Sequence, residues 1–123
     1  MEDVFRFRKF RVYQDARFFR KEIKLLVKKS FPKEERFGLT SQIFRALDSV
    51  LLNIAEGSQK YTDLDFSRFL NMALASVNEV VACFDCAFDY GYINSEEHFS
   101  SCEKASCIHK QLKTFISKLY KDT

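Results

Sequence analysis

The chain has 123 residues, 46% of them hydrophobic, a net charge of +3 at neutral pH, and only three glycines and one proline. This length fits one domain with a buried core, and no apolar run approaches the ~20 residues that a membrane-spanning helix needs. So few turn-forming residues argue against a β-sandwich and favour a few long helices.

The sequence first predicts two long helices. Residues 12–29 carry apolar side chains at spacings of three and four, which places them on one side of a helix. Residues 30–32, Ser-Phe-Pro, end this helix because a residue before proline avoids helical geometry. The second helix is expected to begin near residue 39 or 40 and to end at Glu56, with Gly57 supplying the left-handed position that follows many helices.

Capping sequences mark the starts of two further helices. Residues 62–65, Thr-Asp-Leu-Asp, resemble a capping box with aspartate in place of glutamate. This third helix is expected to stop at Gly91. Asn94, with Glu97 three residues later, predicts the start of the fourth helix, which continues to about Tyr120.

The order and spacing of these segments predict the fold class. Four helices with short connections indicate an all-α protein, an antiparallel up-down-up-down four-helix bundle. We expect a single bundle domain over residues 12–123, preceded by a basic and aromatic arm over residues 1–11. The charged start MEDVFRFRKF lacks the apolar stretch of a signal peptide, so we expect a cytoplasmic protein.

Positive charge is concentrated near the N-terminus. Residues 1–30 contain ten basic and four acidic residues, and the remainder of the chain is net acidic. This asymmetry is typical of a nucleic-acid surface, but it also fits a basic helix that packs beside acidic ones. The predicted nucleic-acid contacts are Arg6, Arg8, Lys9, Arg11, Arg17, Arg20, Lys21 and Lys24.

Within the arm, aromatic rings alternate with cations from Phe5 to Arg11. Alternation suits an extended segment whose rings stack on bases while its cations contact phosphates. Alternatively, the rings pack onto the bundle and only the charges face water.

A polar stripe runs along the second helix beside its apolar side. Because apolar residues cover most of this helix, part of the stripe should be buried and hydrogen-bonded, with Arg45 pairing a carboxylate, for which Glu79 is the candidate. We interpret the stripe as a structural polar seam or a subunit contact. An enzyme built on Arg45, Glu56 and Glu79 is the weaker hypothesis, since no histidine or nucleophile has a matching spacing. The predicted seam comprises Gln42, Arg45, Ser49, Asn53, Glu56 and Glu79.

The four cysteines, Cys83, Cys86, Cys102 and Cys107, are candidate zinc ligands, whereas His98 and His109 are single histidines that we expect at or near the surface. Antiparallel third and fourth helices could bring all four cysteines together. Their spacing is poor for zinc, because the C-x-x-C pair lies inside a helix and Cys102 and Cys107 point to different sides. We therefore expect buried, reduced thiols that pack as small apolar groups. Neither histidine has an H-x-x-x-H pattern. No catalytic residue, metal or cofactor is predicted.

The stretch FPKEERFGLTSQIFRALDSVLLNIAEGSQK, residues 31–60, resembles the signature of a bacterial four-helix-bundle family. The members were first noted as proteins encoded in intervening sequences of 23S ribosomal RNA genes, and the family includes Avd-like accessory proteins of diversity-generating retroelements. The next helix continues the likeness with Phe66, Phe69, Leu70, Ala73, Ser76 and Glu79. The resemblance implies an antiparallel bundle that assembles as a homopentamer. Most members have no established activity, whereas the retroelement branch binds nucleic acid and a reverse transcriptase.

Together these features favour a non-enzymatic, oligomeric bundle that binds RNA or DNA weakly and without sequence preference, and that has no membrane partner. The alternative is a protein-interaction module that docks an acidic partner, such as an accessory protein of a retroelement reverse transcriptase.

Overall fold

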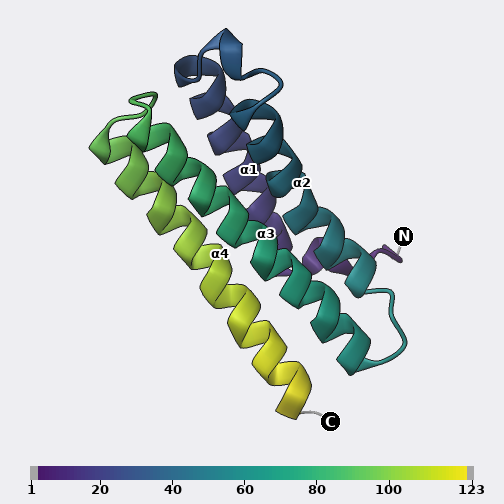
Figure 1. Cartoon of the computed structure of the whole chain (residues 1–123). Coiled ribbons are helices and arrows are strands. Elements are labelled where there is room, and N and C mark those ends of the chain that lie inside the picture. The colour runs from purple at the N-terminus through teal and green to yellow at the C-terminus, as the bar shows by residue number, and fades with distance from the viewer. Residues whose placement is uncertain (1–2, 122–123) are drawn as a thin grey trace.

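The computed structural model describes residues 3–121, which form four α-helices, two short 3-10 helices and no strand (Figure 1). Residues 1–2 of the predicted arm and residues 122–123 of the predicted bundle domain lie outside the described residues. Each helix packs against the next along the chain, and α4 packs back on α1, which confirms the predicted all-α antiparallel four-helix bundle. The elements are η1 (Arg6–Lys9), α1 (Arg11–Ser30), η2 (Lys33–Glu35), α2 (Leu39–Gly57), α3 (Asp63–Asp89) and α4 (Ser95–Lys121).

Helix α3 contributes much of the core. One 18-residue window of α3 has a mean hydropathy of 1.3, so its length and composition alone would let it cross a membrane. In the bundle, Leu70, Val77, Val80 and Phe84 on this helix are each at most 1% exposed. The apolar sequence of α3 is therefore accounted for by packing against the neighbouring helices.

The predicted caps of α3 and α4 are confirmed. The hydroxyl of Thr62 accepts a hydrogen bond from the Asp65 amide at 3.1 Å. At α4 the bonds are reciprocal: the Glu97 amide donates to Asn94 Oδ1 at 2.8 Å, and the Asn94 amide donates to Glu97 Oε1 at 2.9 Å. Gly91 has a φ of 78°, as its predicted position after α3 requires.

Replacing Asn94 with alanine should destabilise the protein by about 1 kcal/mol, because one amide at the start of α4 loses its acceptor. Urea unfolding followed by circular dichroism would measure the change. Ser95→Ala is the matched control, since the exposed Ser95 side chain makes no hydrogen bond to a described residue. Equal effects of the two substitutions would show that the Asn94 cap contributes nothing.

The prediction for Gly57 is wrong. Gly57 is the last residue of α2 and is buried, and among the described residues only Gly91 has a positive φ. A Cβ at Gly57 would lie 2.6 Å from Phe69 Cβ and 3.0 Å from Phe66 Cδ1. The missing side chain therefore lets α3 approach the end of α2 closely.

Glu35 connects the two turns at the other end of the bundle. Its carboxylate accepts from the Leu39 amide at 3.0 Å and from the Tyr92 hydroxyl at 2.8 Å. These two hydrogen bonds hold the pKa of Glu35 below its usual value, and the bond from the Leu39 amide has the larger effect. The start of α2 is thereby tied to the turn between α3 and α4.

Candidate functional site

The N-terminal arm is folded, which confirms the interpretation that its rings pack onto the bundle and makes the alternative of an extended segment wrong. Residues 6–9 form the 3-10 helix η1. The ring centroids of Phe7 and Tyr13 lie 4.9 Å apart, and those of Phe10 and Phe115 lie 5.1 Å apart. Both phenylalanines are only partly exposed, so their rings pack on the bundle instead of standing free for base stacking.

Arg6 fastens this arm to the end of α2. Its guanidinium donates to the Ser58 carbonyl from Nε at 3.1 Å and from Nη2 at 2.9 Å. It also lies over the rings of Phe10 and Phe66, at 5.6 and 5.3 Å from their centroids. Arg6, one of the eight predicted nucleic-acid contacts, therefore helps to hold the arm on the bundle.

Two further predicted contacts, Arg20 and Lys24, are directed toward α2. Arg20 Nη1 lies 3.1 Å from Asp48 Oδ1, and Lys24 Nζ lies 4.0 Å from the same oxygen. The Lys24 ammonium also lies 4.9 Å from the centroid of the Phe44 ring. Their charges are partly neutralised within the bundle.

Both acidic residues of α1 bond to α4. Asp15 Oδ2 accepts from Gln111 at 2.9 Å, and Glu22 Oε2 accepts from Lys104 at 2.9 Å. Beyond Arg11, which pairs with Asp15, the acids of α1 consequently pair with no cation of the same helix among the described residues. We call the exposed α1 residues Arg17, Lys21 and Lys28 the basic face; none forms an ion pair with a residue in the range 3–121.

The other predicted cations lie in or beside the arm. Arg8 and Arg11 each lie 3.5 Å from a carboxylate, Asp3 and Asp15 respectively, and their side chains are 58% and 86% exposed. Such exposed pairs contribute little and leave the guanidinium accessible. Lys9 is exposed and forms no ion pair with the described part of the chain.

A groove of about 480 Å³ lies between the arm and α4. No acidic residue lines it, and its cations come from both elements. Phe10 and Phe115 supply an apolar surface between them. The lining residues are Phe10, Arg11, Val12, Lys110, Gln111, Thr114, Phe115 and Lys118.

The polar stripe on α2 divides into a half-buried and an exposed part. The half-buried residues are connected: Asn53 Nδ2 donates to Ser49 Oγ at 3.0 Å, and the Ser76 hydroxyl donates to Ser49 Oγ at 2.8 Å. Gln42, Arg45, Glu56 and Glu79 are exposed.

The expected ion pair between Arg45 and Glu79 does not form within the chain. Glu79 accepts from Gln42 Nε2 at 3.3 Å instead, and Arg45 forms no ion pair with any described residue. Both residues line a pocket of about 270 Å³, together with Gln42, Ala46 and Ser49. It offers no histidine or thiol to a substrate.

The four cysteines do not assemble into one cluster within residues 3–121. All four are free thiols, and Cys83 is buried as expected. The expectation of buried thiols is wrong for Cys86 and Cys107, which are exposed. Burial, and to a smaller extent the negative charge of Glu79, raise the pKa of Cys83 to about 11. This thiol is therefore protonated at neutral pH.

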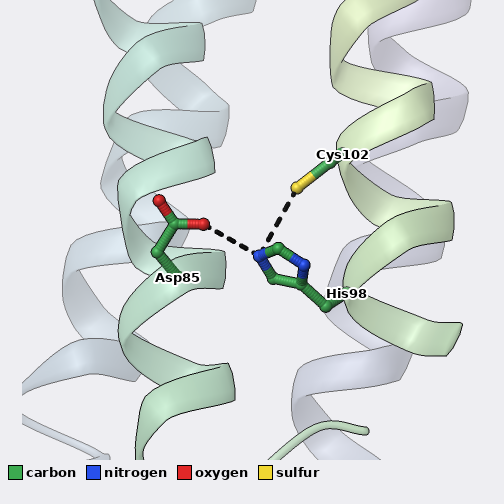
Figure 2. Close-up of side chains that lie close together, drawn as sticks. All are labelled: Asp85, His98 and Cys102. Atoms are coloured by element: carbon green, nitrogen blue, oxygen red, sulfur yellow. Dashed lines mark hydrogen bonds and ion pairs between the residues drawn. The ribbon is translucent and has the colours of Figure 1, made fainter. Parts of the chain in front are cut away.

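A different cluster was missed at the sequence level: Asp85 on α3 with His98 and Cys102 on α4 (Figure 2). The signal was the i, i+4 spacing of His98 and Cys102, which places them on the same side of a helix. Burial first, and the charge of Asp85 second, raise the pKa of Cys102. The cluster therefore does not activate this thiol as a free nucleophile.

The fold and these surfaces define the class of protein: a small antiparallel four-helix bundle with a basic face on its first helix. Residues 8–114 match the family described as 23S rRNA-intervening sequence protein, and the chain belongs to this family. This membership confirms the resemblance that the residues of α2 and α3 indicated.

Among solved structures, the chain is similar to a protein with unknown function from the S23 ribosomal protein family of Bacteroides thetaiotaomicron. The two are 28% identical and superpose with a TM-score of 0.77 over 85% of this chain and 97% of that chain. No curated protein matches the sequence. The family is one of largely unknown function, so the surfaces described above must carry the functional argument.

Proposed function

We propose that the protein is a non-enzymatic, oligomeric scaffold that binds RNA or DNA weakly and without sequence preference. The basic face carries this proposal, because Arg17, Lys21 and Lys28 are exposed while the acids of α1 are bonded to α4. Free cations on one side of a helix can contact consecutive phosphates without reading bases.

The geometry narrows the set of proposed phosphate contacts. Arg8, Lys9, Arg11, Arg17 and Lys21 are exposed, and Arg8 and Arg11 form only exposed ion pairs that leave their guanidinium groups accessible. Arg6, Arg20 and Lys24 are instead directed toward other parts of the bundle. The groove between the arm and α4 extends the positive surface, since it presents cations beside two rings and no acid. Binding through so few contacts should be weak and strongly dependent on salt.

Assembly as a homopentamer is part of the same proposal. Exposed apolar side chains on all four helices support it, among them Phe18, Leu52, Met72 and Phe99, each more than 50% exposed. Several copies of the basic face in one particle would raise the avidity for a long nucleic acid. The mass in solution, measured by light scattering at several concentrations, tests this step, and a monomer at all of them would remove it. The proposed particle has a cytoplasmic location and no membrane partner.

Replacing Arg17 and Lys21 together with glutamate should weaken binding of a labelled structured RNA about tenfold at low salt. Fluorescence anisotropy at about 50 and 200 mM salt would measure the affinities and their salt dependence. Losing two phosphate contacts should also lower the magnitude of the salt slope by about two.

The matched control reverses Lys33 and Arg36, which are exposed on and beside η2 at the end of α1. This variant has the same net charge as the first, so the two differ only in which surface carries the new glutamates. An equal loss of RNA affinity in both variants would mean that net charge alone causes it. Undiminished RNA binding after reversal of the basic face would contradict the proposal.

The second candidate is an interaction module that docks an acidic protein, with a retroelement reverse transcriptase as one possibility. The mixed character of α1 favours it, because Phe18 and Leu25, 65% and 69% exposed, lie among the cations. Salt sensitivity alone does not separate the two functions. A partner that stays bound after nuclease treatment, and is lost with the glutamate variant, would favour the protein partner.

A further inference from the structure

We propose that Asp85, His98 and Cys102 form a binding site for a transition-metal ion, with Zn²⁺ as the best fit (Figure 2). The site lies between α3 and α4 and uses no residue of the basic face. It is therefore independent of the proposed nucleic-acid function.

The three ligand atoms converge on one point. His98 Nε2 lies 2.8 Å from Asp85 Oδ1 and 3.7 Å from Cys102 Sγ, and all three atoms lie within 4.8 Å of one another. Figure 2 shows both contacts meeting at the same ring nitrogen, with the carboxylate arriving from α3 and the thiol from α4. One nitrogen cannot direct its single N–H or lone pair at both groups, whereas an ion placed among the three atoms would bind all of them.

This convergence also distinguishes a metal site from a catalytic relay. In a relay the carboxylate would bond one ring nitrogen and the thiol the other, so that the imidazole passes a proton between them. Here Nε2 faces both Asp85 and Cys102. The arrangement is that of ligands around a centre.

The spacing of the atoms fits tetrahedral coordination. With a Zn–N distance of about 2.0 Å and a Zn–S distance of about 2.3 Å, tetrahedral angles separate nitrogen and sulfur by about 3.5 Å, close to the separation in the structure. The nitrogen and oxygen would be about 3.3 Å apart, so Asp85 must withdraw by roughly half an ångström from its hydrogen bond to His98. The Asp85 side chain is 61% exposed and has room to do so.

The donor set selects the class of ion. A thiolate, an imidazole and a carboxylate suit Zn²⁺ or Co²⁺, whereas Ca²⁺ and Mg²⁺ prefer oxygen ligands alone. Binding would take the unprotonated Nε2 of the imidazole and release the thiol proton of Cys102 to solvent. The exposed side of the site leaves the fourth position to water.

The surroundings hold two of the ligands in place. His98 and Cys102 are one helical turn apart on α4, and the Phe88 ring of α3 lies 5.0 Å from the His98 ring. Only the Asp85 side chain has to adjust on binding. A largely preformed site loses less conformational entropy when the ion enters.

Titration with Co²⁺ tests the site directly. The protein would carry Cys86→Ser and Cys107→Ser, which remove the two exposed thiols outside the site. We expect one Co²⁺ per chain, with the visible absorption of a tetrahedral ion and a thiolate-to-cobalt charge-transfer band, both reversed by Zn²⁺. In this background Cys102→Ser should abolish the charge-transfer band.

Asp85→Asn provides a second test of the site, because this largely exposed side chain can be changed without disturbing the core. Since even outer-shell partners contribute about tenfold to metal affinity, losing this ligand should weaken Co²⁺ binding at least about tenfold. Absence of the charge-transfer band in the background protein, or its persistence after Cys102→Ser, would overturn the proposal. If Cys102→Ser does not fold, unchanged Co²⁺ affinity in Asp85→Asn would overturn it equally.

Discussion

Replacing Gly57 with valine should destabilise the bundle by about 2–3 kcal/mol. The added Cβ would lie 2.6 Å from Phe69 Cβ, an atom that the α3 backbone holds in place. Moving the Phe69 ring alone does not relieve this contact, so the end of α2 and the start of α3 must separate. Urea unfolding at a fixed protein concentration would measure the loss in the free energy of unfolding.

Two companion variants make this result specific. Leu52→Val introduces the same β-branched residue at a position of α2 that is 66% exposed, and it should change stability by no more than about 0.5 kcal/mol. Gly57→Ala should fall between the two, because the helix propensity that alanine gains, about 1 kcal/mol, offsets part of the clash. A Gly57→Val protein as stable as Leu52→Val would contradict the close approach of α2 and α3.

Gly57 also shows where local sequence signals stop being informative. The glycine after Glu56 was predicted to be a left-handed helix end, yet it is helical and buried against α3. A glycine needed for its backbone conformation and one needed for its lack of a side chain look the same in a sequence. Only the neighbouring helix, which is distant in the chain, distinguishes them.

The capping sequences were informative because their physics is local. Asn94 and Glu97 are three residues apart and satisfy each other's amides, so no distant contact is required. The same reasoning explains the successful prediction of four helices from apolar spacing and short connections. Helix starts and helix faces depend on residues within one or two turns.

The surfaces were harder to predict, because exposure depends on how the helices pack. Arg45 and Glu56 lie in a mostly apolar helix, and yet both are exposed. The basic residues of α1 looked equivalent in the sequence, but Asp48 of α2 pairs with Arg20, while Arg17 pairs with no acid in the described part of the chain. The cluster of Asp85, His98 and Cys102 was missed for a related reason, since Asp85 joins the other two only across the interface between α3 and α4.

Replacing Phe84 with alanine should have the largest effect, a loss of about 3–5 kcal/mol of stability. Phe84 is 1% exposed, and its ring lies edge-on to Phe19 with centroids 6.4 Å apart. This contact joins α3 to α1, which are not neighbours along the chain. Removing the ring leaves a cavity whose walls belong to different helices, and each helix is held by its other contacts, so the walls can collapse only partly.

The size of the effect distinguishes a packed centre from a surface ring. Phe99→Ala, at a position 67% exposed on α4, should change the free energy of unfolding by about 0.5 kcal/mol or less. Phe84→Leu should recover most of the loss, because it keeps an apolar side chain of similar volume. Because a small domain is typically stable by only about 5–15 kcal/mol, Phe84→Ala should leave the bundle partly unfolded at modest urea concentrations. Similar losses from Phe84→Ala and Phe99→Ala would mean that the ring at position 84 does not fill the centre between α1 and α3.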